Sequence, residues 1–162
     1  MTNCLTPAEA QLLAKVRQLN KISNEKAHLW TVSTSSIHGS GAVFQETVLP
    51  PTFIGLISVC VGTNRRPEFL KAMYDEGLHP VNCGPPALRH SWLRTDFGRM
   101  LNEDVKNPTC IGQHWVPNGS RHEVANKPHH VFGEYKLAVT IKRVSVDDEA
   151  TMKYTLYRGS EY

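Results

Sequence analysis

The apolar segment at residues 53–61 constrains the fold of this chain more than any other stretch. It contains β-branched residues and is apolar at both alternating sets of positions, which is typical of a strand buried on both faces. Such a strand needs a neighbour on each side and a packed layer above and below it. A chain of 162 residues buries about 70% of the surface that it exposes when unfolded, so we expect one domain over residues 1–162.

A helix is predicted near the start of the chain. Thr6 is suited to cap it, Pro7 to its first turn, and Glu9 to complete a capping box with Thr6. Apolar residues recur at helical spacing over residues 7–20, and this apolar face covers the domain's own core or docks on a neighbour. In the second case the helix is an assembly arm. The candidate self-association residues are Leu12, Leu13 and Val16.

Two further helices are expected. One follows the turn at residues 64–67 and ends at Gly77. The other starts at residue 87 or 91 and runs to residue 105, because apolar residues line one broad face there.

Antiparallel strands account for most of the remaining predicted structure. Residues 28–34 and 42–49 are predicted strands on either side of a glycine-containing turn. Alternating apolar residues at 134–146 and 151–158 predict a C-terminal β-hairpin joined through three acidic residues. The expected class is therefore α+β, with a mostly antiparallel sheet packed against about three helices.

The charge balance is mildly basic, with a formal net charge of +3. This is less than a dedicated duplex-binding protein usually carries. Basic residues occur at one strand-to-helix turn and on the outward row of the expected hairpin, where they suit phosphates of RNA or lipid headgroups. The candidate residues for an anionic partner are Arg65, Arg66, Lys136, Lys142 and Lys153.

Residues 107–133 are predicted to form a long loop that contains several of the 8 histidines. Its candidate metal ligands match no compact zinc template, and they are Cys110, His114, His122 and His129. A second alternative is a cysteine nucleophile at Cys83, with His90 or His114 as its base. The chain has no glycine-rich phosphate loop, so we assign no catalytic residue and expect no cofactor.

The expected compartment is intracellular. No segment is apolar over a length that would span a membrane, and the start of the chain lacks the pattern of a secretory signal. The 4 cysteines show no paired spacing, which favours reduced thiols.

Two segments taken together resemble those of rhabdovirus matrix proteins. The first is the apolar strand that runs into residues 64–69 and a helix, and the second is residues 132–141 followed by the acidic residues 147–149. They are similar in type and order to the early and late sheet segments of that family. The resemblance implies a non-enzymatic viral structural protein of the virion that self-associates and bridges nucleocapsid and membrane. Its implied partners are a second copy, nucleoprotein, RNA or an anionic membrane surface.

The sequence as a whole favours a small protein that acts by self-association and by binding anionic partners. Two alternatives stay open. One is a metal protein or small enzyme built on the histidine-rich loop, and the other is a modest RNA-binding module.

Overall fold

The protein is built around β3 (Phe53–Cys60), which lies between β8 (Tyr135–Thr140) and β5 (Trp92–Arg94). Every residue of β3 after the first is buried. This confirms the central strand predicted from the apolar pattern. The structure is a computed structural model, and it describes residues 4–81, 91–117 and 132–153.

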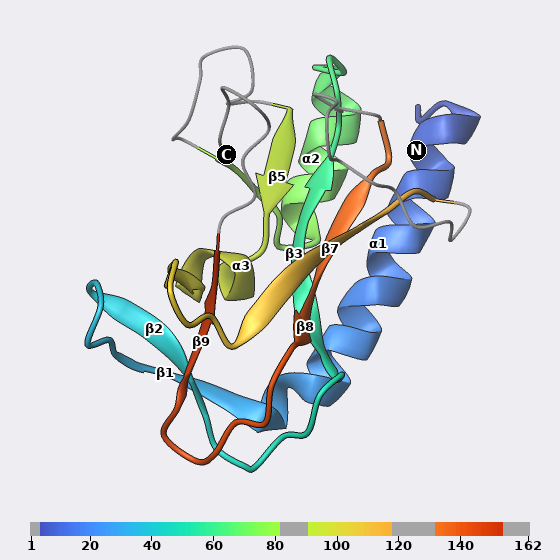
Figure 1. The fold of residues 1–162 in the computed structure, drawn as a ribbon. Coiled ribbons are helices and arrows are strands. Elements are labelled where there is room, and N and C mark those ends of the chain that lie inside the picture. Colours follow the sequence, from blue (N-terminus) through green and yellow to red (C-terminus); the bar gives the residue numbers. More distant parts are fainter. Residues whose placement is uncertain (1–3, 82–90, 118–131, 154–162) are drawn as a thin grey trace.

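The sheet is mostly antiparallel, and the architecture is the predicted α+β class (Figure 1). Its strand order over the described residues is β1-β2-β9-β7-β8-β3-β5-β4, with β6 beside β9. β9 runs parallel to β6 and to β7. The other strands are β1 (Trp30–Thr34), β2 (Ser40–Phe44), β4 (His79–Pro80), β6 (Asn102–Glu103), β7 (Cys110–Trp115) and β9 (Glu149–Met152).

The first helix forms as predicted and continues further. α1 (Pro7–Lys26) begins with the expected capping box, in which Glu9 N donates to Thr6 Oγ1 and Thr6 N donates to Glu9 Oε1. The short 3-10 helix η1 (Ala27–Leu29) then leads into β1. In the described part of the chain, no helix combines the length and the apolar character needed to cross a membrane.

Two apolar cores lie on the two sides of the sheet. α1 and α2 (Pro67–Asp75) bury Leu12, Val16 and Phe69 against β3 residues such as Leu56 and Val59. On the other side, α3 (Asp96–Met100) packs Phe97 with residues of β2, β3 and β9. The β1–β2 ribbon projects beyond these helices (Figure 1).

In the described part of the helix predicted up to residue 105, only residues 96–100 are helical. Residues 92–103 instead form β5, the short helix α3 and β6. Pairing of β5 with β3 overrides the helical spacing of the apolar residues, and Thr95 starts a new helix by accepting a hydrogen bond from Gly98 N. Gly98 lies so close to β3 that a Cβ there would be 2.5 Å from the Ile57 carbonyl oxygen.

The predicted C-terminal hairpin also differs from the structure. β8 and β9 are not neighbours, because β7 lies between them. β7 comes from residues 110–115, which we predicted to be part of the long loop. Residues 154–158 of the predicted second strand lie outside the described residues.

Candidate functional site

Four polar residues form one row across four neighbouring strands. Arg94 of β5 lies opposite Ser58 of β3, and Ser58 lies opposite Lys136 of β8. Lys136 in turn lies opposite His114 of β7. Directly opposite residues of antiparallel strands point to the same face of the sheet, so these side chains lie side by side. We call Arg94, Ser58, Lys136 and His114 the buried charged row, in which Arg94 is half-buried and the other three residues are buried.

Glu134 joins the buried charged row from just before β8. Its Oε2 lies 2.6 Å from Nδ1 of His114, and both side chains are buried. The ring of Trp92 meets the His114 ring edge to face, with 6.0 Å between the centroids. The imidazole is therefore held in place by a carboxylate at one nitrogen and by an aromatic ring at its edge or face.

A cavity of about 30 Å³ adjoins the buried charged row. Its polar lining comes from Ser58, Arg94 and Lys136, and its apolar lining includes Trp92 and Met152. Ser58 Oγ and Arg94 Nε are buried and accept or donate no hydrogen bond within the described structure. A space of this size holds about one water molecule or one small ion.

Lys136 is the most unusual member of the row, because its side chain has 0% exposure. Burial lowers its pKa well below the usual value, since the charged ammonium is disfavoured away from water. The negative charge of Glu134 raises the pKa of Lys136, whereas the positive charge of Arg94 lowers it further. Lys136 is thus a group whose charge depends on what lies beside it.

The structure corrects the prediction that Lys136 lies on a solvent face. β8 is paired on both sides, with β3 and β7, and both of its faces are covered. Alternation along a strand separates inward from outward positions only where one face meets water. In β8 it separates the two buried faces instead.

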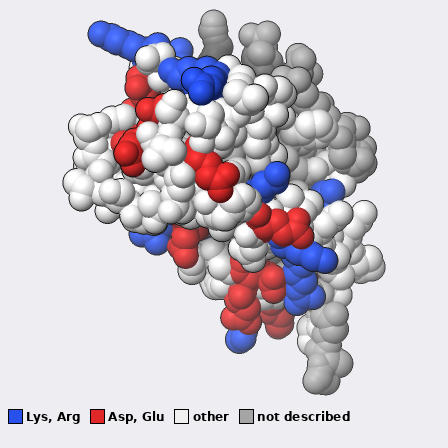
Figure 2. Space-filling view, turned by 90° about the horizontal axis from the view of Figure 1, so that it is seen from below, with Lys and Arg blue, Asp and Glu red and all other residues white. Residues whose placement is uncertain are grey.

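The other predicted basic residues do not converge on one surface. Arg65 follows the Cys60 end of β3, whereas Lys142 follows the Thr140 end of β8. The two strands are antiparallel, with Val59 opposite Tyr135. Arg65 and Lys142 therefore lie near opposite ends of the paired strands. Lys142 Nζ donates to Asn107 Oδ1 at 2.6 Å, and Lys153 is exposed. Figure 2 shows basic and acidic side chains interspersed over the visible face.

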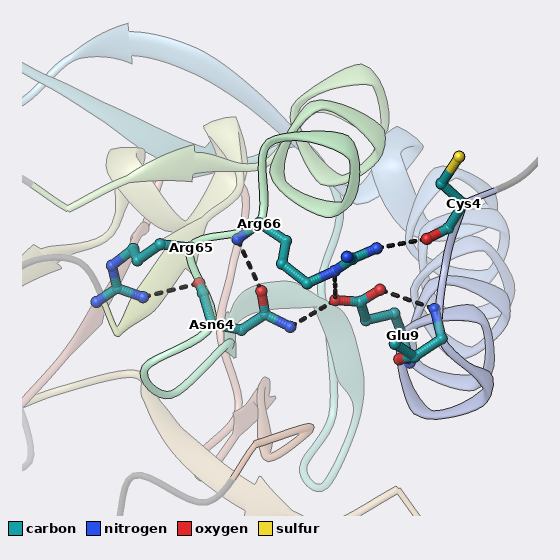
Figure 3. A network of polar contacts seen from close by, with 6 residues as sticks. Cys4, Glu9, Asn64, Arg65 and Arg66 are labelled. Atoms are coloured by element: carbon teal, nitrogen blue, oxygen red, sulfur yellow. Dashed lines mark hydrogen bonds and ion pairs between the residues drawn. The ribbon is translucent and has the colours of Figure 1, made fainter.

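Arg66 belongs to a network that joins two helices (Figure 3). Its Nε donates to Oε2 of Glu9 at 2.9 Å, and Asn64 Nδ2 donates to the same oxygen at 2.7 Å. A further nitrogen of Arg66 donates to the carbonyl of Cys4. Burial by itself raises the pKa of Glu9, but the hydrogen bonds from Asn64, Thr6 and Arg66 outweigh it and leave this pKa lowered. The network fixes the start of α2 against α1.

The candidate self-association residues lie inside the protein. Leu12, Leu13 and Val16 are buried in the core formed by α1, α2 and β3. The helix therefore takes the first of its two predicted roles and covers the domain's own core. In this structure these side chains offer no free face to a second copy.

The candidate metal ligands are only partly described. Cys110 and His114 are both buried on β7, and burial raises the pKa of Cys110 to about 11. Burial likewise raises the pKa of Cys60 to about 12. Over residues 4–81, 91–117 and 132–153, no group of three histidine, cysteine or acidic side chains is placed to hold a metal ion. His122, His129, Cys83 and His90 lie outside the described residues.

Sequence reasoning missed three members of this site: Ser58, Arg94 and Glu134. Arg94 was assigned to a helix and Glu134 to the start of a hairpin strand. Ser58 carried a usable signal, because it is a polar residue within a strand predicted to be buried on both faces. A buried hydroxyl needs a polar partner, which points to further polar groups on the neighbouring strands.

The comparisons with known proteins identify no family for the chain. No protein-family model matches the chain, and no curated protein matches it. One solved structure, a candidate histone methyltransferase of Plasmodium falciparum, is similar with a TM-score of 0.46 and 16% sequence identity. The similarity covers 78% of this chain and 92% of that chain. A likeness at this level supports no statement about function.

Proposed function

We propose that the protein binds the anionic group of a small ligand at the buried charged row. The observation that carries this proposal is the pair of buried polar atoms, Ser58 Oγ and Arg94 Nε, beside a cavity that Lys136 also lines. Hydroxyl, guanidinium and ammonium groups are the donors that hold carboxylates and inorganic anions in proteins. Because the cavity is about 30 Å³, it admits a single small ion or one end of a larger ligand.

Lys136 gives the site a second capacity, which is proton exchange, because burial lowers its pKa. An anion beside Lys136 would favour the charged ammonium, since a nearby opposite charge raises the pKa of a lysine. Anion binding at this row is therefore coupled to proton uptake.

Isothermal titration calorimetry tests this proposal directly. Chloride, acetate and phosphate are titrated separately into the protein, each in two buffers that differ in ionisation enthalpy. We expect saturable binding of at least one anion, with a buffer-dependent enthalpy that reports proton uptake. The three anions distinguish an inorganic ion from a carboxylate as the preferred group.

Substitutions of the residues that line the cavity test whether the anion binds there. Ser58→Ala and Arg94→Met each remove one donor. We expect each to increase the dissociation constant of the anion by about tenfold, as loss of one hydrogen bond to a charged group does. Lys142→Met removes a half-buried positive charge that does not line the cavity, and it serves as the matched control. Equal anion affinity in Arg94→Met, Ser58→Ala and wild type would contradict the proposal.

Self-assembly, of the kind implied by the resemblance to rhabdovirus matrix proteins, is the second candidate function. The observation that favours it is the open edge of β1, where Val32 is 53% exposed. Nucleoprotein, RNA or an anionic membrane would then be partners for the exposed Arg65 and Lys153 and the half-buried Lys142. RNA binding through these residues would weaken as salt is added, and salt-independent affinity would argue against it.

A further inference from the structure

β1 forms one edge of the sheet. It pairs with β2 on one side, and no other strand of the described structure pairs with it. The four residues after Trp30 are all exposed, and Val32 has 53% of its surface open to solvent. Figure 1 shows β1 at the outer side of the projecting β1–β2 ribbon.

The hydrogen bonds at the two ends of this ribbon tell which backbone groups face outward. Gln45 N donates to Leu29 O, and Ser35 N donates to Gly39 O. In an antiparallel pair, bonded and non-bonded positions alternate. With Trp30 opposite Phe44, the residues bonded to β2 are therefore 29, 31, 33 and 35. The N–H and C=O groups of residues 30, 32 and 34 point away from β2.

Trp30 is already satisfied at this outer edge. Its N–H donates to the Ala27 carbonyl, and its carbonyl accepts from Gln45 Nε2 at 3.0 Å. The backbone groups of Val32 and Thr34 have no such partner among the described residues. The open edge thus consists of two donors and two acceptors, and we call these four groups the β1 edge.

The β1 edge lacks the usual protection against pairing. Exposed edge strands normally carry a lysine, a proline or a bulge that prevents another strand from adding to the sheet. Residues 31–36 contain no charged residue and no proline, and the register between β1 and β2 is continuous over all five residue pairs.

We propose that the β1 edge pairs in antiparallel fashion with the β1 edge of a second copy of this chain. A two-fold axis at Ser33 places Val32 opposite Thr34 of the second copy, and Thr34 opposite its Val32. Each of these pairs exchanges two hydrogen bonds. All four outward groups on each copy are then satisfied.

A second copy fits this edge because the edge is self-complementary. The same two residues supply donors and acceptors on both sides of the axis, and no like charges meet. Two-fold symmetric pairing is the commonest arrangement of identical subunits. Two five-residue strands bury less than the roughly 1,200 Å² of a stable interface, so the dimer is weak and depends on concentration. The inference is independent of the proposed anion site.

Sedimentation equilibrium across a wide concentration range tests the pairing and its register. We expect the wild-type mass to rise from monomer toward dimer with concentration. In Val32→Lys with Thr34→Lys, lysines of the two copies lie opposite one another, and we expect the dissociation constant to increase by about tenfold or more. Val32→Lys with Thr34→Glu places opposite charges at the same positions, so we expect its dimerisation to return to near the wild-type level.

Val105→Lys, at another exposed apolar side chain, is the control for added charge. Circular dichroism confirms that each variant is folded. Hydrogen exchange gives a readout that needs no variant, since the amides of Val32 and Thr34 should become protected as concentration rises. A wild type that stays monomeric would overturn the proposal. So would equal dissociation of the lysine–glutamate and lysine–lysine variants, because it would rule out the register.

Discussion

Nδ1 of His114, on β7, lies 2.6 Å from Oε2 of Glu134, the residue just before β8, and both side chains are buried. A buried pair of this kind contributes little net stability compared with apolar residues, but removal of one partner leaves the other without compensation. The pair is therefore a sensitive probe of the site.

Glu134→Ala should lower the free energy of unfolding by about 3–5 kcal/mol, because His114 and Lys136 then lose their carboxylate neighbour in the interior. Urea unfolding followed by circular dichroism measures the change. His114→Ala in the same background should add much less than it does alone, since the partner is already absent. Additive losses in the double variant would show that the two side chains are not coupled.

Lys136→Met should change how stability depends on pH. The unfolded chain keeps the Lys136 proton up to about pH 10.4, whereas the folded protein releases it at lower pH because burial lowers this pKa. Between those two values the unfolded state binds more protons, so wild-type stability rises with pH by up to about 1.4 kcal/mol per pH unit. The Met variant lacks this contribution.

Unfolding curves of both proteins from neutral to alkaline pH check this expectation. The unfolding free energy of Lys136→Met minus that of the wild type should be largest at the lower end of the pH range. This difference should shrink as pH rises. A constant difference over the whole range would mean that the folded protein keeps Lys136 charged.

Arg66→Met and Arg65→Met form a matched pair at adjacent positions. Arg66 is bonded to the carboxylate of Glu9, which is 1% exposed, so its loss should cost about 1.5–3 kcal/mol of unfolding free energy. Arg65 donates only to nearby backbone carbonyls, those of Gly62 and Asn64, in the contacts described. Its substitution should change stability by less than about 0.5 kcal/mol. Thermal unfolding of the two variants distinguishes them, and equal losses would exclude the network as the cause.

The described cysteines should differ in reactivity. Cys4 is exposed, whereas Cys60 and Cys110 are buried with pKa values raised to about 12 and about 11. Because the thiolate is the reactive form, a thiol reagent at neutral pH should modify Cys4 in the folded protein and the other two only after unfolding. Mass spectrometry of peptides from the Cys83→Ser variant provides the measurement. Rapid labelling of Cys60 in the folded protein would contradict the buried position of β3.

The sequence predicted those elements whose signals are local. The capping box at Thr6 and Glu9, the apolar spacing of α1 and the two-sided burial of β3 all depend on near neighbours in the chain, and the structure confirms each of them. The helix predicted over residues 92–103 forms only at residues 96–100, because residues 92–94 pair with β3 and β4 as the strand β5. Hydrophobic spacing contains no information about which distant strand will be adjacent.

The site was predictable only in fragments for the same reason. Lys136 and His114 were both recognised as chemically interesting, but one was assigned to a solvent face and the other to a loop. Their contact depends on β7 inserting beside β8, and the register of that pair is set by side-chain packing on both faces. Ser58 and Arg94 can be recognised as residues of the site only after this order of strands is known.

The pairing of β2 with β9 has a consequence for how the chain reaches its folded state. Ala42 of β2 lies opposite Ala150 of β9, so β2 cannot complete its pairing until β9, which is distant in the sequence, is present. Contacts between residues so distant in sequence slow folding, because a long loop must close before they form. During synthesis the β1–β2 ribbon emerges before β9 and cannot join the rest of the sheet until residues 149–152 have left the ribosome. In that interval the unpaired strands are exposed to pairing with other chains, so the time between synthesis of β2 and synthesis of β9 affects the yield.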